Sequence, residues 1–115
     1  MIKYLEKLND ILSVKGIILS DKDGIIIESL MSSTLNKELI AAMAAKVALN
    51  IESNISSIDN VIASHCIIFT DSVNIFFSIL GDLILIIVAD KDINIGFVKI
   101  EMNKAINQLK EEFSQ

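Results

Sequence analysis

The chain has 115 residues, of which 52% are hydrophobic and 22% charged; this balance favours one packed domain over residues 1–115 and argues against disorder. Its formal net charge of −5 argues against nucleic-acid binding, which needs a concentrated basic surface. The longest apolar run, Leu83 to Ala89, is too short to span a bilayer, and Glu6 and Asp10 argue against a signal peptide. We therefore expect a soluble cytoplasmic protein with no direct membrane insertion.

The first elements in chain order are a short helix and a hairpin. Residues 2–12 carry apolar side chains at helical spacing, which predicts an amphipathic helix. Residues 16–20 and 25–30 read as strands, and the Asp21-Lys22-Asp23-Gly24 segment between them is typical of a hairpin turn, with glycine available for a positive φ. We interpret the two aspartates as turn residues, because an EF-hand loop needs a different glycine position and a later glutamate.

The next stretch, residues 35–58, is rich in alanine and is apolar on more than one side. On a helical wheel, one broad stripe wide enough to cover a sheet contains Ile40, Met43, Ala44, Val47, Ile51 and Ile55. A second row has the spacing four, three, four, three that is typical of a helix-pairing seam, and it contains Leu35, Leu39, Ala42, Lys46 and Leu49. Candidate N-caps are Ser32, Ser33, Thr34 and Asn36, and the pattern does not choose among them.

Three strands and a last helix complete the pattern. Residues 61–69, 73–80 and 83–89 form a meander, with turns at 70–72 and 81–82. Asn94 is the expected cap of a final helix, whose apolar residues are Val98, Met102, Ile106, Leu109 and Phe113. Because several strands are apolar without alternation, both faces of the sheet must be covered. We predict an α/β (α+β) fold in which a five-stranded, mainly antiparallel sheet lies between helices, the middle helix on one face and the terminal two on the other.

The order helix, two strands, long helix, three strands, helix resembles the roadblock (dynein light chain) family, a sandwich of the profilin and longin type. The resemblance covers essentially the whole chain and is carried by the turn at residues 21–24, by Glu38-Leu39-Ile40-Ala41-Ala42, by the Gly81-Asp82 turn and by Asn94-Ile95-Gly96-Phe97-Val98. A longin domain is the nearest confusable fold, but longins typically begin with a strand.

The resemblance implies a dimeric module that binds a Ras-like small GTPase and scaffolds or regulates it. In such modules the long middle helices pair across a two-fold axis and the following strand extends the sheet into the partner; here these elements are residues 35–58 and 61–69. Lys46 could then reach Glu38 of the other chain. The expected interface residues are Leu35, Glu38, Leu39, Ala42, Ala45, Lys46, Leu49 and His65.

Nothing in the pattern predicts catalysis, a metal site or a cofactor. His65 and Cys66 are adjacent on a strand and point to opposite faces, so they cannot form a nucleophile–base pair within one chain. The four glycines form no phosphate-binding motif. All ten basic residues are lysine, so the chain cannot supply an arginine finger to a partner GTPase.

We therefore expect a non-enzymatic homodimer. The alternative is a structural subunit of a larger scaffold, paired with other roadblock or longin proteins and without effect on the nucleotide cycle. A small-ligand sensor is disfavoured because the core strands carry too few polar groups to line a pocket.

Overall fold

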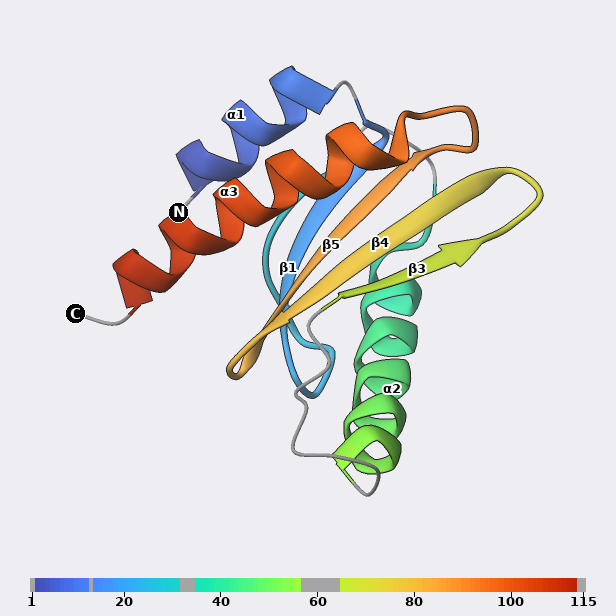
Figure 1. Cartoon of the computed structure of the whole chain (residues 1–115), viewed down its shortest axis with the longest axis vertical. Coiled ribbons are helices and arrows are strands. Elements are labelled where there is room, and N and C mark those ends of the chain that lie inside the picture. Colours follow the sequence, from blue (N-terminus) through green and yellow to red (C-terminus); the bar gives the residue numbers. More distant parts are fainter. Residues whose placement is uncertain (1, 13, 32–34, 57–64, 114–115) are drawn as a thin grey trace.

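The computed structural model describes residues 2–12, 14–31, 35–56 and 65–113, and its element order is the predicted one (Figure 1). In chain order the elements are α1 Ile2–Leu12, β1 Gly16–Asp21, β2 Ile26–Met31, α2 Lys37–Ser56, β3 His65–Phe69, β4 Val73–Leu80, β5 Leu83–Asp90 and α3 Ile95–Phe113. The predicted ends of the long helix at 57–58 and of the following strand at 61–64 lie outside the described residues.

The five strands form one antiparallel sheet in the order β2-β1-β5-β4-β3. The tight turn at Gly81 and Asp82 sets the register of β4 and β5, in which Leu80 lies opposite Leu83 and Val73 opposite Asp90. Gly81 has a positive φ of 57°, which a residue without a side chain adopts easily. The β1–β5 pair at the centre of the sheet joins the first hairpin to the later meander.

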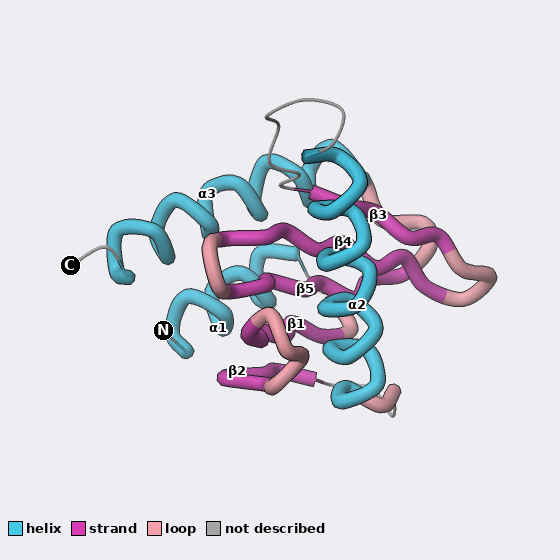
Figure 2. The backbone as a smooth tube through the Cα atoms, turned by 90° about the horizontal axis from the view of Figure 1, so that it is seen from below, coloured by secondary structure: helices cyan, strands magenta, loops and turns pink. Residues whose placement is uncertain are grey.

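Helices cover both faces of this sheet, with α1 and α3 on one side and α2 on the other (Figure 2). Alternate residues of the central strands therefore enter two different cores. On β5, Leu85 and Ile87 pack under α1 and α3, while Ile84 and Ile86 pack under α2. This arrangement explains why the strands are apolar without alternation, and it confirms the predicted α+β sandwich.

Short polar side chains fix the turns and helix starts. Asp21 Oδ1 accepts hydrogen bonds from the Asp23 and Ile25 backbone nitrogens, each at 2.9 Å, which supports the interpretation of this segment as a turn. Asn36 is the cap that the structure selects for α2, because its Oδ1 accepts from the Leu39 backbone N–H at 3.1 Å. Asn94 caps α3 as predicted.

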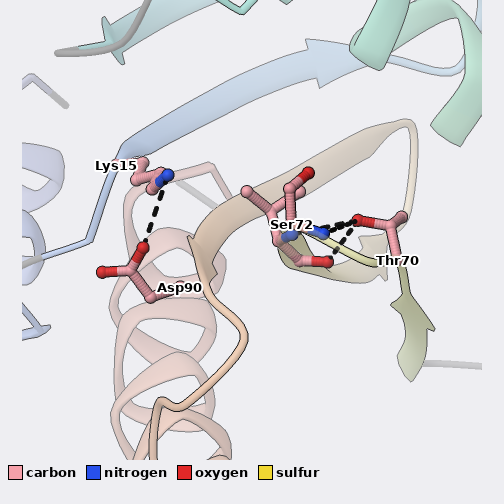
Figure 3. A network of polar contacts seen from close by, with 5 residues as sticks. Lys15, Thr70, Ser72 and Asp90 are labelled. Carbon is pink, nitrogen blue, oxygen red and sulfur yellow. Dashed lines mark hydrogen bonds and ion pairs between the residues drawn. The ribbon is translucent and has the colours of Figure 1, made fainter.

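A second set of polar contacts fixes the sheet end near the β3–β4 turn (Figure 3). Thr70 Oγ1 accepts from the backbone N–H groups of Ser72 and Val73 and donates to the Val73 carbonyl at 2.7 Å. Lys15 Nζ lies 3.4 Å from Asp90 Oδ1 and links the chain just before β1 to the last residue of β5. Both side chains of this ion pair are well exposed, so we assign it little stabilisation.

The β1–β2 pair contains an irregularity close to its turn. Leu19 lies opposite Glu28, but the next residue, Ser20, lies opposite Ile26, so Ile27 is an extra residue on β2. Such a bulge bends and twists the strand that carries it. β2 is one edge strand of the sheet, so a further strand that paired there would meet an irregular backbone.

Candidate interaction surface

The outer face of α2 exposes apolar side chains. Leu39 and Leu49 are 67% and 65% exposed, and Leu35, just before the helix, is 38% exposed. Ala42 and Lys46 lie between the two leucines and are also exposed. The structure therefore places the whole predicted row, with Glu38 beside it, on the surface of the described chain. Leucines at this exposure contribute little to the fold of one chain, and their burial needs a partner.

Ala45, also predicted at the interface, does not share the exposure of this row in the single chain. It is only 7% exposed, and it packs on the sheet with three other alanines of α2, Ala41, Ala44 and Ala48. Alanine has no side chain beyond Cβ, so these four residues let the helix axis approach the strands closely. The bulky residues expected at the centre of the sheet-facing stripe instead flank it half-buried, namely Ile40, Met43 and Val47.

The edge strand β3 lies beside α2 at one side of the sheet. It pairs with β4 on one side, and its other side pairs with no strand among the described residues. His65 is exposed, and its Nδ1 is 2.6 Å from the hydroxyl oxygen of Ser78 on β4. The buried Ser78 hydroxyl in turn donates to Met102 Sδ of α3 at 3.1 Å. His65 therefore faces the α3 side of the sheet rather than the α2 side.

Cys66 points to the opposite face, as predicted. Cys66 is half-buried, as is Ile68 on the same strand. Both pack against the core under α2, which includes Phe77. Burial raises the pKa of the Cys66 thiol, and a hydrogen bond with the Ile67 backbone opposes this effect in part. His65 and Cys66 therefore do not form a reactive pair. In the described part of the chain, no three acidic, histidine or cysteine side chains are grouped to hold a metal ion.

Phe69, the last residue of β3, is a surface residue that sequence reasoning missed. It is 64% exposed although it ends a strand of apolar residues. Its position in the sequence, directly before the Thr70-Asp71-Ser72 turn, could have indicated this exposure, because the end of a strand is less covered by helices than its middle. Among the described residues of this edge, His65 to Phe69, there is no Asp, Glu, Lys or Arg.

The two edges of the sheet differ in their readiness to pair. The β2 edge carries the extra residue Ile27 and the acidic Glu28, two devices that oppose the addition of another strand. The described residues of β3 are in regular register with β4 from His65 to Phe69. Of the two, β3 is thus the edge suited to extension. None of the described helices is long and apolar enough to cross a membrane.

Comparison with known sequences identifies similar proteins of about the same length in Methanocaldococcus jannaschii. No known family's sequence profile matches the chain. The uncharacterized proteins MJ0310 and MJ0714 of Methanocaldococcus jannaschii are 26% and 28% identical to it over 111 residues. These alignments cover 96% of this chain and 97% and 94% of the two relatives.

Comparison with solved structures establishes the fold class, which is that of roadblock/LC7 domains. Myxococcus xanthus MglB superposes with a TM-score of 0.89 at 18% identity, covering 97% of this chain and 93% of that chain. A roadblock/LC7 domain from Streptomyces avermitilis gives 0.88 at 16% identity, covering 100% and 98%. An MglB with a tetrameric arrangement gives 0.86 at 15% identity, covering 96% and 85%. At these identities the likeness concerns the fold, and it confirms the resemblance noted in the sequence at that level.

Proposed function

We propose that this chain is a non-enzymatic module that forms a homodimer through α2 and β3 and, as a dimer, binds and scaffolds or regulates a Ras-like small GTPase. The proposal is supported by the exposed leucine row of α2 together with β3, an edge strand in regular register that pairs with no second strand among the described residues. The roadblock/LC7 fold supports the same reading, because the resemblance implies dimeric GTPase-binding modules, and one solved neighbour is a tetrameric MglB.

The spacing of the α2 residues suits a two-fold axis through Ala42. Glu38 and Lys46 each lie four residues from Ala42, and Leu35 and Leu49 each lie seven residues from it. In an antiparallel pair of helices crossing at Ala42, each lysine would therefore face the partner's glutamate, and each Leu49 would approach the end of the partner helix that Leu35 precedes. The small Ala42 side chain at the crossing lets the two helices approach closely.

Edge pairing adds a second set of contacts to this dimer. Two copies of β3 related by the same axis would pair antiparallel and join the two sheets, as edge strands do when nothing blocks them. Phe69 would then lose much of its exposure to water. Each Å² of apolar surface that the dimer removes from water contributes about 25 cal/mol to its stability.

The composition supports a role without chemistry in the GTPase cycle. Stimulation of hydrolysis in trans is commonly provided by an arginine finger, and this chain has no arginine. Regulation would therefore act through the position of the partner's own catalytic groups or through sequestration of the GTPase.

The dimer is tested by light scattering on the wild type, on Leu39→Glu and on the control Ile100→Glu. Ile100 is 57% exposed on α3, so the control introduces the same charge at a similarly exposed apolar residue on the other face. We expect a dimer at micromolar concentration for the wild type and the control, and a monomer for Leu39→Glu. A monomeric wild type, or a Leu39→Glu variant that still dimerises, contradicts the proposal.

The α2 geometry has its own test. Lys46→Glu places like charges opposite each other and should weaken the dimer, and adding Glu38→Lys to the same chain should restore it. A double variant no better than Lys46→Glu alone contradicts the proposed crossing at Ala42 but leaves other dimer geometries open to the first test.

GTPase binding is tested by pull-down of small GTPases loaded with GDP or with a GTP analogue. We expect retention in at least one nucleotide state, and loss of retention with Leu39→Glu. A chain that dimerises but retains no GTPase in either state supports the alternative, a structural subunit of a larger scaffold.

A further inference from the structure

A groove lies between α1 and α3, on the side of the sheet away from α2. Its volume is about 230 Å³, and Tyr4, Lys7 and Ile11 line it from α1, while Glu101, Lys104 and Gln108 line it from α3. Figure 1 shows the two helices side by side and running in opposite directions. The proposed dimer contacts on α2 and β3 do not use this surface.

The size of the groove fits one large side chain better than a cofactor. Its volume of about 230 Å³ is below the range of about 300–1,000 Å³ that is usual for ligand sites. Its lining residues recur every three or four positions on each helix, so the groove is straight and about 10 Å long at 1.5 Å rise per residue. Such a shape between two helices suits a third helix that inserts a side chain.

Several apolar side chains in or near the groove are exposed to solvent. Ile11 lines it and is 41% exposed, and Phe97, one turn before Glu101 on the same side of α3, is also 41% exposed. Ile100 on the neighbouring ridge is 57% exposed. The end of the groove where α1 finishes and α3 starts thus has exposed apolar side chains in or near it.

The charges at the groove favour an acidic partner. Two lysines line it against a single carboxylate, Glu101, whose side chain is only 12% exposed and lies 3.3 Å from Lys104 Nζ. Lys104 is 67% exposed, so its ammonium group is available to a second carboxylate. The side chains that line the groove thus include two lysines and one glutamate, in a chain with a formal net charge of −5.

We propose that the α1–α3 groove docks an amphipathic helix of a partner protein, which inserts one large apolar or aromatic side chain and places acidic residues against Lys7 and Lys104. A module that dimerises through α2 and β3 would keep two such grooves open on its other face. The chain could then hold a second protein while its α2 side is occupied.

The test uses a short synthetic helical peptide with a central tryptophan flanked by glutamates, and a second peptide with lysines at the same positions. Binding is measured by tryptophan fluorescence, and the site is located from backbone amide shifts of the full chain. We expect the glutamate peptide to bind and to shift amides of α1 and α3. Lys7→Glu with Lys104→Glu should weaken it about tenfold, since two partly exposed ion pairs are reversed.

The matched control carries Lys99→Glu and Lys110→Glu, two exposed lysines of α3 that do not line the groove. Its affinity should equal that of the wild type, and Ile11→Asn should weaken binding without changing charge. No binding at millimolar peptide, equal binding of the lysine peptide, or shifts on α2 and β3 instead would each overturn the proposal. Light scattering on the same variants reports the α2 dimer independently, so the two proposals fail separately.

Discussion

The side-chain oxygen of Asn36 lies 3.1 Å from the backbone nitrogen of Leu39 and accepts its hydrogen bond, so the cap of α2 also holds the first exposed leucine within that helix. The Asn36 carbonyl accepts the first helical hydrogen bond from Ile40 at 3.1 Å. One residue therefore determines where the helix begins and in which direction its outer face points.

Asn36→Ala should lower the free energy of unfolding by about 1 kcal/mol, because an N-cap replaced by alanine leaves a helix N–H without its partner. Urea denaturation measures this loss. Asn50→Ala is the control, since Asn50 is exposed in the interior of the same helix, where alanine is favoured. Equal stability of the two variants would show that the cap does not hold α2.

Gly24→Ala should destabilise the chain more than Gly81→Ala. Both glycines have positive φ, 86° and 57°, so each substitution strains the backbone by about 1 kcal/mol. An added Cβ at Gly24 would also lie 3.0 Å from the Ala42 Cα of α2, whereas nothing lies within 4 Å of one at Gly81. The two variants share the backbone strain, so the difference between their unfolding free energies measures the cost of the steric contact between the first hairpin and α2.

Phe77→Ala and Phe69→Ala should separate folding from assembly. Phe77 is 1% exposed in the core under α2, and its truncation should cost about 3–5 kcal/mol and leave much of the chain unfolded. Phe69 is 64% exposed, so its truncation should leave the circular dichroism spectrum unchanged and weaken only the dimer. A large loss of folded signal with Phe69→Ala would place that residue in the core instead.

Cys66 should react slowly with a thiol reagent in the native chain and rapidly in urea. Burial raises the pKa of its thiol, so at neutral pH the native chain holds less thiolate than the unfolded chain. The same shift makes native stability fall as the pH rises through the pKa of the unfolded thiol, because the unfolded chain then ionises first. It is the only cysteine, so Cys66→Ser is a complete control. Equal rates in buffer and urea would contradict the burial.

Much of the fold follows from sequence because local signals agree with one another. The β4–β5 hairpin is predicted to within one residue, since Gly81 and Asp82 separate two largely apolar runs, and β5 ends at Asp90 instead of Ala89. The positions of α1 and α3 follow from the periodic spacing of their apolar residues. The interaction surface follows in part, because Leu39 and Leu49 stand on the side of α2 that the helical wheel separates from the bulkier stripe.

Other features depend on distances that a sequence does not contain. A helical wheel weights Ile40 and Val47 above alanine, yet the approach of α2 to the sheet is set by Ala41 and Ala44, which fit where larger residues do not. The choice of Asn36 as cap depends on where the helix meets the sheet, because serine and threonine offer the same chemistry nearby. The groove between α1 and α3 depends on the spacing of two helices that are far apart in the chain.

The extra residue at Ile27 bears on how far assembly can proceed. A sheet with two regular edges offers each added copy a fresh site for the next, and growth of that kind ends in an open fibre. A sheet with one regular edge uses that edge once. In the proposed dimer, where β3 of one copy meets β3 of another, both outer borders of the joined sheet would be β2 strands, and the irregular strand would then oppose further growth as well as shape one hairpin.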